Sequence, residues 1–163
     1  MEKIVRRYPI GVQNFEDLRN TNYVYVDKTD LVYKLVHSNK VYFLSRPRRF
    51  GKSLLVSTLE AYFSGKKELF KGLAMERLEK EWYVYPVLHM DFSISKYMNA
   101  DMLRSVINNR LVEWEKVYGR EESENTFSLR LKGIIQRAYE QTGMQVVILI
   151  DEYDSPMLDS NND

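Results

Sequence analysis

The sequence has no cysteine and only two histidines, and these absences remove several kinds of chemistry. Without cysteine the chain forms no disulfide, no thiolate metal site and no covalent intermediate on sulfur. His37 and His89 offer little for a histidine-based metal centre. Net charge is also nearly absent, because 24 Lys and Arg face 23 Asp and Glu. The overall charge therefore gives no reason to expect binding to DNA, an anionic membrane or an acidic partner.

Long apolar segments are missing as well. The first residues, Met1–Arg7, lack the apolar stretch of about 7 to 15 residues that a secretory signal requires, and the longest aliphatic run is only Val146–Ile150. We therefore expect a cytoplasmic protein that does not enter the membrane. The 163 residues are 44% hydrophobic and 13% aromatic, and no linker-like segment divides them. This composition predicts one domain, residues 1–163, with a core of its own.

Strand-like and helix-like segments alternate along the chain, which predicts an α/β fold with a parallel sheet. The predicted strands are Val41–Leu44, Val87–Phe92 and Val146–Ile150. The last is continuously aliphatic, so we expect it to be buried on both faces. The predicted helices cover residues 29–39, 51–64, 101–118 and 127–142, with shorter helical pieces at 67–70 and 75–82. Asp27 or Thr29 is expected to cap the first of these helices.

A phosphate-binding sequence follows the first predicted strand. In the segment 46–53, Gly51, Lys52 and Ser53 stand at the start of a predicted helix. A P-loop needs this arrangement, because backbone N–H groups and the helix dipole hold phosphate oxygens, the lysine reaches the outer phosphates and the hydroxyl binds Mg²⁺. Arg46 replaces the first glycine of the usual pattern. Since Pro47 favours an extended conformation at Arg46, that position does not require glycine.

Arg48 and Arg49 add two cations beside this anion site. They contact the nucleotide, or they face a partner or solvent, and the sequence leaves both readings open.

An acidic pair, Asp151 and Glu152, directly follows the aliphatic strand 146–150. Ligands of open α/β sheets bind at the carboxyl ends of the strands, where this pair is expected to lie. In a Walker B arrangement the Asp assists Mg²⁺ and the Glu orients and deprotonates the attacking water. The Asp-x-x-Gly and Asn-Lys-x-Asp patterns of GTPases are absent, which favours ATP. Asp91 ends the preceding predicted strand on the same edge, and either joins the site or is a capping or solvated residue.

Several motifs together resemble the AAA-ATPase-like family of predicted bacterial and archaeal P-loop ATPases. They are Tyr8–Val12 followed by Phe15, Tyr25–Thr29, Ser45–Ser53 and Ile150–Asp154. The resemblance covers nearly the whole chain, and an absent first P-loop glycine is normal in that family. It implies a three-layer α/β/α P-loop domain that binds ATP and Mg²⁺, with Walker A at 46–53 and Walker B at 146–152. The nucleotide contacts implied are Arg48, Arg49, Phe50, Gly51, Lys52, Ser53 and Leu54, with Ser53 and Asp151 on the metal and Lys52 and Glu152 in catalysis.

The resemblance also implies a strand order of 5-1-4-3-2, with a strand after Asp163 between the P-loop strand and the Walker B strand. We therefore expect these residues to be the amino-terminal part of a longer protein, with an open edge beside 146–150. On this view the 163 residues alone bind nucleotide poorly and turn over little, and they associate with themselves or with a carboxyl-terminal region. Nucleic acid is expected only through an attached nuclease-like domain. The alternative is a non-hydrolysing nucleotide-binding, phosphate-binding or protein-interaction module.

Overall fold

The computed structural model describes residues 7–21, 23–45, 50–93 and 100–153. The chain divides into two compact units, an amino-terminal unit, Met1–Val84, and a carboxyl-terminal unit, Tyr85–Asp163. The amino-terminal unit is helical in its described part, whereas the carboxyl-terminal unit contains a parallel two-stranded sheet. The predicted α/β class with a parallel sheet is confirmed. The three-layer P-loop arrangement stays a prediction.

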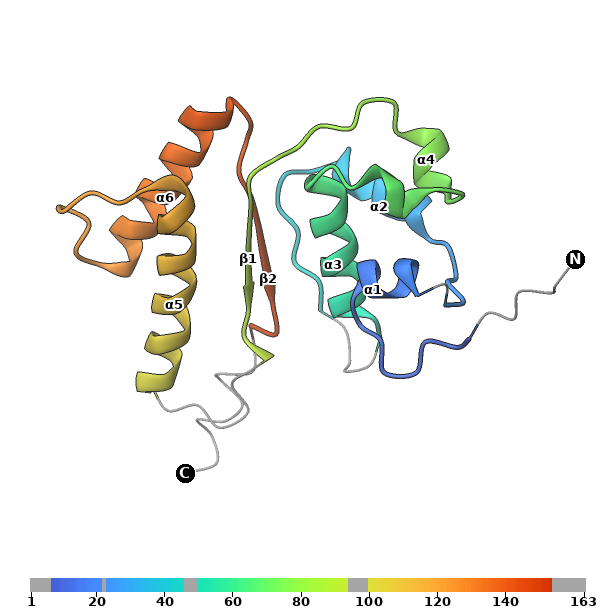
Figure 1. The fold of residues 1–163 in the computed structure, drawn as a ribbon, viewed down its shortest axis with the longest axis horizontal. Helices are drawn as coiled ribbons and strands as arrows, with labels where there is room; N and C mark the ends of the chain where they lie inside the picture. The colour runs from blue at the N-terminus through green and yellow to red at the C-terminus, as the bar shows by residue number, and fades with distance from the viewer. Residues whose placement is uncertain (1–6, 22, 46–49, 94–99, 154–163) are drawn as a thin grey trace, which may run out of the picture. The chain divides into compact units, whose positions relative to one another are not determined.

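Short helices surround an aromatic core in the amino-terminal unit (Figure 1). The helices are α1 (Phe15–Asn20), α2 (Thr29–Val36), α3 (Lys52–Phe63), η1 (Lys67–Phe70) and α4 (Ala74–Leu78). The helices expected at 29–39, 51–64 and 67–70 are confirmed, and the piece expected at 75–82 ends at Leu78. The buried core consists of Phe15, Val32, Ala61, Tyr62, Leu69, Phe70, Leu73 and Met75. Helix α1, which supplies Phe15, was not predicted.

The predicted strand Val41–Leu44 is wrong for the described structure. These residues form no regular element, and Val41 and Phe43 are 87% and 74% exposed. Their β-branched and aromatic side chains have high strand propensity, but a strand forms only when a neighbouring backbone completes its hydrogen bonds. Within the described residues no segment pairs with 41–44, so the propensity has no structural effect there.

Asp27 joins the starts of two helices. Its Oδ1 accepts hydrogen bonds from the backbone N–H and the hydroxyl of Thr29, at 2.9 and 2.7 Å, and its Oδ2 accepts from the Ala74 N–H at 2.7 Å. Thr29 Oγ1 also accepts from the Met75 N–H at 3.0 Å. Burial alone would raise the pKa of Asp27, but these hydrogen bonds outweigh it and hold the pKa below its ordinary value. The N-cap residue of α2 is Lys28, whose side chain makes no capping hydrogen bond, and Asp27 instead binds the N–H of Thr29 from the position before it and also anchors α4.

The carboxyl-terminal unit consists of two parallel strands and two long helices. Strand β1 (Val87–Asp91) is followed by α5 (Ala100–Tyr118), α6 (Phe127–Thr142) and β2 (Val147–Asp151). The strands pair in parallel from Val87 with Val147 to Asp91 with Asp151. Both helices lie on one side of the sheet in Figure 1, and Leu88, Leu111 and Ile134 form the buried core between sheet and helices. All four elements were predicted within one or two residues of these bounds.

Strand β2 is not buried on both faces, contrary to expectation. Ile148 and Ile150, which share a face by strand alternation, are 47% and 53% exposed, whereas Leu149 is buried. The ladder to β1 uses the Val147 N–H and the Asp151 carbonyl, so the peptide groups of the alternate residues point to the opposite edge. No other strand of the described chain pairs with that edge. A strand at a sheet edge keeps part of its apolar surface exposed, which explains the error.

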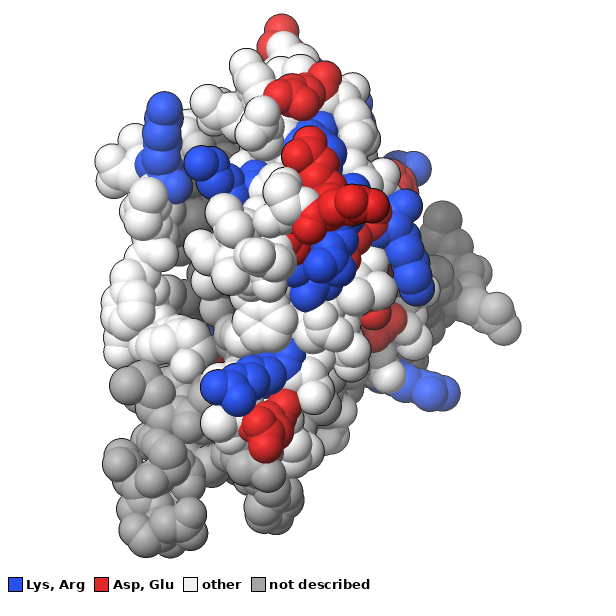
Figure 2. Space-filling model, turned by 90° about the vertical axis from the view of Figure 1, so that its left-hand side faces the viewer, with Lys and Arg blue, Asp and Glu red and all other residues white. Residues whose placement is uncertain are grey.

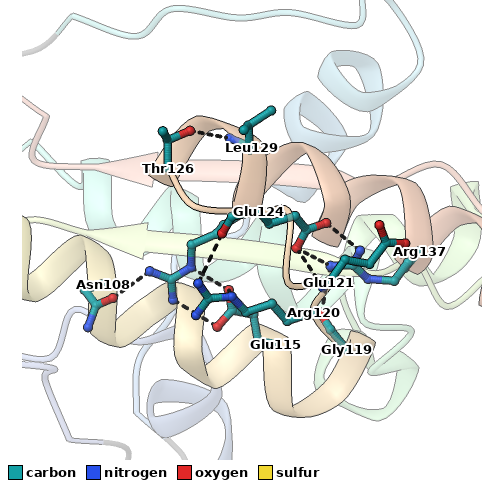
Figure 3. A network of polar contacts seen from close by, with 10 residues as sticks. Asn108, Glu115, Gly119, Arg120, Glu121, Glu124, Thr126, Leu129 and Arg137 are labelled. Carbon is teal, nitrogen blue, oxygen red and sulfur yellow. Dashed lines mark hydrogen bonds and ion pairs between the residues drawn. The ribbon is translucent and has the colours of Figure 1, made fainter.

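Two arginines of α6 fix the connection between α5 and α6. Arg130 binds Glu115 through Nε and Nη2, at 2.6 and 2.9 Å, and Arg137 binds Glu124 through its two Nη atoms at the same distances. The arginine hydrogen bonds hold the pKa of both glutamates below the ordinary range. Figure 3 shows this network, in which Glu124 reaches from the loop between the helices onto α6.

Gly133 provides the space for this network. A Cβ at Gly133 would lie 1.6 Å from Oε1 of Glu124 and 2.8 Å from Nη1 of Arg137. A glycine inside a helix normally costs about 1 kcal/mol relative to alanine. Here the glycine is required because the Glu124 carboxylate occupies the place of a side chain.

The charges on this side of the carboxyl-terminal unit are mixed. Figure 2 shows acidic and basic side chains next to one another, and the face it displays has no broad area of one sign. Such a face does not provide the single-sign field that attracts a nucleic-acid backbone. In the described part of the chain, no helix combines the length and apolar character needed to cross a membrane.

The Asp27 cap predicts a specific pH dependence. Because folding lowers the pKa of Asp27, the carboxylate stabilises the fold above its unfolded-state pKa of about 3.9, and this contribution is lost as the pH falls through the lower folded-state value. Asp27→Asn keeps one acceptor oxygen but replaces the other, which accepts from the Ala74 N–H, by an amide donor, so it should lower the free energy of unfolding by about 1 kcal/mol at pH 7. The difference from wild type should shrink below pH 4 in urea titrations. Asp30→Asn, the control on the same helix, should change less, and a pH-independent Asp27→Asn effect would contradict the account.

Gly133→Ala should destabilise the protein although alanine favours helix. The added Cβ displaces the Glu124 carboxylate from Arg137, so the thermal unfolding midpoint should fall. In a Glu124→Ala background the same substitution should raise the midpoint, because the Glu124 carboxylate is gone and the Arg137 side chain, no longer paired with it, can move away from the added Cβ. Thermal unfolding of the four proteins of this double-mutant cycle measures both effects, and the same sign in both backgrounds would exclude the steric explanation.

Candidate functional site: a phosphate-binding helix start and an acidic strand end

The start of α3 is a glycine turn that leads directly into the helix. Gly51 is its N-cap and adopts a left-handed conformation, with φ 75° and ψ 27°. An added Cβ would meet no atom within 4 Å, so the backbone conformation and not lack of space requires glycine. The first helical hydrogen bond runs from the Leu55 N–H to the Gly51 carbonyl at 3.0 Å. The amides that open a helix have no acceptor within it, and together with the helix dipole they favour an anion.

Lys52 and Ser53 are the first two residues of α3, and both are partly buried. Leu54 packs against the aromatic core, so any contact it makes with phosphate comes from its backbone N–H. Phe50 precedes the turn and is 64% exposed. The helix predicted to begin at about Gly51 is confirmed, but residues 41–44 before it do not form the predicted strand. Arg48 and Arg49, like Arg46 and Pro47, lie outside the described residues.

Ser57, which the sequence did not single out, fixes α3 to the segment before α1. Its Oγ accepts a hydrogen bond from the Phe15 N–H at 3.0 Å and donates to the carbonyl of Leu54 at 3.0 Å. Phe15 is fully buried and anchors α1 in the core. The hydroxyl therefore positions the helix that carries Lys52 and Ser53. Only the fold reveals this role, because the hydrogen bond joins residues 42 positions apart.

Acidic residues meet at the carboxyl ends of β1 and β2. Asp151 ends β2, is 6% exposed and pairs in register with Asp91 at the end of β1. Its Oδ1 accepts a hydrogen bond from the Glu152 N–H at 2.9 Å. The Asp91 carboxylate accepts from the Ser93 N–H at 2.7 Å and from its hydroxyl at 2.9 Å. Of the two roles left open for Asp91, the structure shows capping of the turn after β1.

Glu152 has the only positive φ among the described residues other than glycine, at 53°. This left-handed conformation costs an ordinary residue about 1–2 kcal/mol, and glycine would adopt it without that cost. Residues kept in such a conformation are concentrated at functional sites. The backbone thus supports the functional reading of Glu152 over that of a residue leading into a solvated loop.

The two parts of the candidate site belong to different units. Gly51, Lys52 and Ser53 lie in the amino-terminal unit, and Asp151 and Glu152 lie in the carboxyl-terminal unit. The predicted helix start at Gly51 and the predicted strand end at Asp151 are present, whereas a common nucleotide between them stays a prediction. No group of three or more Asp, Glu and His side chains gathers to hold a metal in the described ranges. His37 is the C-cap of α2, with Nδ1 2.8 Å from the Tyr33 carbonyl, as expected for a capping histidine.

Comparison with known proteins identifies relatives of this chain. The sequence profile of the family described as "Predicted AAA-ATPase" matches residues 9–163, which include both parts of the site. A protein of Azotobacter chroococcum mcd 1, described as "Uncharacterized protein in vnfD 5'region", is 37% identical over 156 residues, which are 95% of this chain and 30% of that protein. The chain thus spans less than a third of this relative's length. No solved structure matches it.

The left-handed conformation of Glu152 makes a stability prediction. Glu152→Gly should raise the free energy of unfolding by about 0.5–1 kcal/mol, because glycine adopts positive φ without steric cost. Glu152→Ala removes the same carboxylate but keeps the Cβ, so it should bring no such gain. Urea denaturation of both variants measures the difference, and equal stabilities would show that the conformation at Glu152 carries no strain.

Proposed function

The chain belongs to the predicted AAA-ATPase family, and from that premise we propose that it is the ATP-binding and Mg²⁺-dependent ATP-hydrolysing module of a longer protein. The observation that carries the proposal is the left-handed Gly51 at the N-cap of α3, followed by Lys52 and Ser53 as the first helical residues. A helix start of this form binds phosphate through backbone amides and a lysine ammonium.

The groups present suit a nucleotide with magnesium. The Lys52 ammonium would bind the outer phosphates, and the Ser53 hydroxyl and the Asp151 carboxylate would hold Mg²⁺. Protein sites for this ion commonly use one or two side chains together with phosphate oxygens and water, so no cage of carboxylates is needed. When bound, Mg²⁺ neutralises charge on the phosphate oxygens. Arg48 and Arg49 are further candidates for phosphate contacts.

Glu152 is the proposed general base. The water oxygen forms a bond to the γ-phosphorus while the bond from that phosphorus to the bridging oxygen breaks, which yields ADP and inorganic phosphate. Glu152 orients this water and accepts its proton. The proposal requires the two units to bring Lys52 and Asp151 to one nucleotide.

The open edge of β2 can accept a further strand beside the strand that carries Asp151. Ile148 and Ile150 expose apolar surface beside an edge that no described strand occupies. Such an edge is a template for a further strand. This supports the expectation that another polypeptide segment, from a longer chain or from a second copy, adds to the sheet.

Two substitutions, made in the longer protein, separate ATP binding from ATP hydrolysis. Lys52→Ala should weaken ATP binding about tenfold to a hundredfold, because it removes charge-assisted hydrogen bonds to phosphate. Glu152→Gln should leave ATP affinity unchanged and lower kcat by about 10²–10⁴-fold. Lys34→Ala and Glu122→Gln are controls at exposed positions. Calorimetry measures binding and phosphate release measures turnover.

The outcomes distinguish the competing functions. Unchanged phosphate release in Glu152→Gln would contradict hydrolysis by this residue. ATP binding without phosphate release in the wild type would favour a non-hydrolysing nucleotide-binding module. Equal ATP affinity of Lys52→Ala and wild type would contradict nucleotide binding at α3.

A further inference from the structure

The peptide group that joins Asp151 to Glu152 is hydrogen-bonded on both sides. Its oxygen, the Asp151 carbonyl, accepts from the Phe92 N–H at 3.1 Å, and its N–H, that of Glu152, donates to Oδ1 of Asp151 at 2.9 Å. Together with the φ of 53° at Glu152, this peptide orientation sets the direction in which the Glu152 side chain leaves the strand.

The bond from Phe92 depends on a turn that Asp91 closes. Phe92 lies between Asp91 and Ser93, and the Asp91 carboxylate binds both the N–H and the hydroxyl of Ser93. A side chain that binds the backbone two residues ahead fixes the turn between them. The intervening Phe92 N–H is thereby held in position to extend the β1–β2 ladder by one bond, to Asp151.

We propose that Asp91 is a positioning residue that orients the Asp151–Glu152 peptide through Ser93 and Phe92. The orientation of the peptide by Asp91 is inferred from hydrogen-bond geometry alone. Its effect on ATP hydrolysis rests on the proposed function. Asp91 acts by accepting hydrogen bonds, and its negative charge is not required. Asparagine at this position preserves the turn, because its carbonyl oxygen accepts from the Ser93 N–H and its amide donates to the Ser93 hydroxyl.

If Asp91 acts by accepting hydrogen bonds, asparagine at this position should preserve the turn and alanine should not. Asp91→Ala should speed amide hydrogen exchange at Phe92 and Glu152 about tenfold, because the closed turn no longer holds the ladder bond. Asp91→Asn should exchange as the wild type does. Ser93→Ala keeps the hydrogen bond from the Ser93 backbone N–H and removes the one from the hydroxyl. Its exchange rates should lie between those of the two Asp91 variants. Exchange is followed by NMR on the 163-residue chain.

The same variants are assayed for ATP hydrolysis. Asp91→Ala should lower kcat about tenfold to a hundredfold with unchanged KM, as expected when a catalytic group is misplaced. Asp91→Asn should retain most of the wild-type kcat. If Asp91→Asn is as damaging as Asp91→Ala in either measurement, the charge matters and the inference is overturned.

Unchanged exchange in Asp91→Ala would also overturn it. If the wild type releases no phosphate, hydrolysis by this chain fails, while the exchange measurement still decides the role of Asp91.

Discussion

The parallel pairing of β1 with β2 is the constraint on which the acidic part of the candidate site depends. Parallel strands end at the same edge, and the register that aligns Val87 with Val147 also aligns Asp91 with Asp151. A shift by one residue would move every side chain of β2 to the opposite face and carry Asp151 away from its buried position. Helices α5 and α6 maintain the pairing from one side, through Leu88, Leu111 and Ile134.

Two bidentate ion pairs hold the connection between α5 and α6 in place. Arg130 and Arg137 each bind a glutamate with two hydrogen bonds, and Gly133 leaves space for one of those carboxylates. Bidentate arginine pairs fix orientation as well as distance. Within the described residues, α5, α6 and the loop between them are therefore fixed relative to one another, and they lead directly into the strand that ends in Asp151.

Local sequence patterns were sufficient for the longer helices and for both strands of the sheet, but they missed α1. Asp27 marks the start of α2 by residue type, and its carboxylate binds the N–H of Thr29, the first residue of that helix. Patterns failed where the outcome depends on distant partners. Val41–Leu44 has strand propensity but no pairing segment among the described residues, and Ile148 is exposed because β2 lies at a sheet edge.

The candidate site shows the same division. The helix start at Gly51, Lys52 and Ser53 could be predicted because a glycine before a helix is a local signal, and the strand end at Asp151 because an aliphatic run precedes it. The sequence did not predict three features of the structure. They are the hydrogen bond from Asp27 to α4, the anchoring of α3 by Ser57 and the positive φ of Glu152. Each depends on tertiary contacts or on a backbone angle that no short pattern specifies.

The central claim is that Lys52 and Asp151 act on one nucleotide with one magnesium ion. A crystal structure with a non-hydrolysable ATP analogue and Mg²⁺ tests it most directly. The account predicts the Lys52 ammonium on the outer phosphates, the Ser53 hydroxyl about 2.1 Å from the ion, and the Asp151 carboxylate bound to that ion directly or through water. An analogue bound elsewhere, or at α3 with Asp151 far from its ion, would contradict the account.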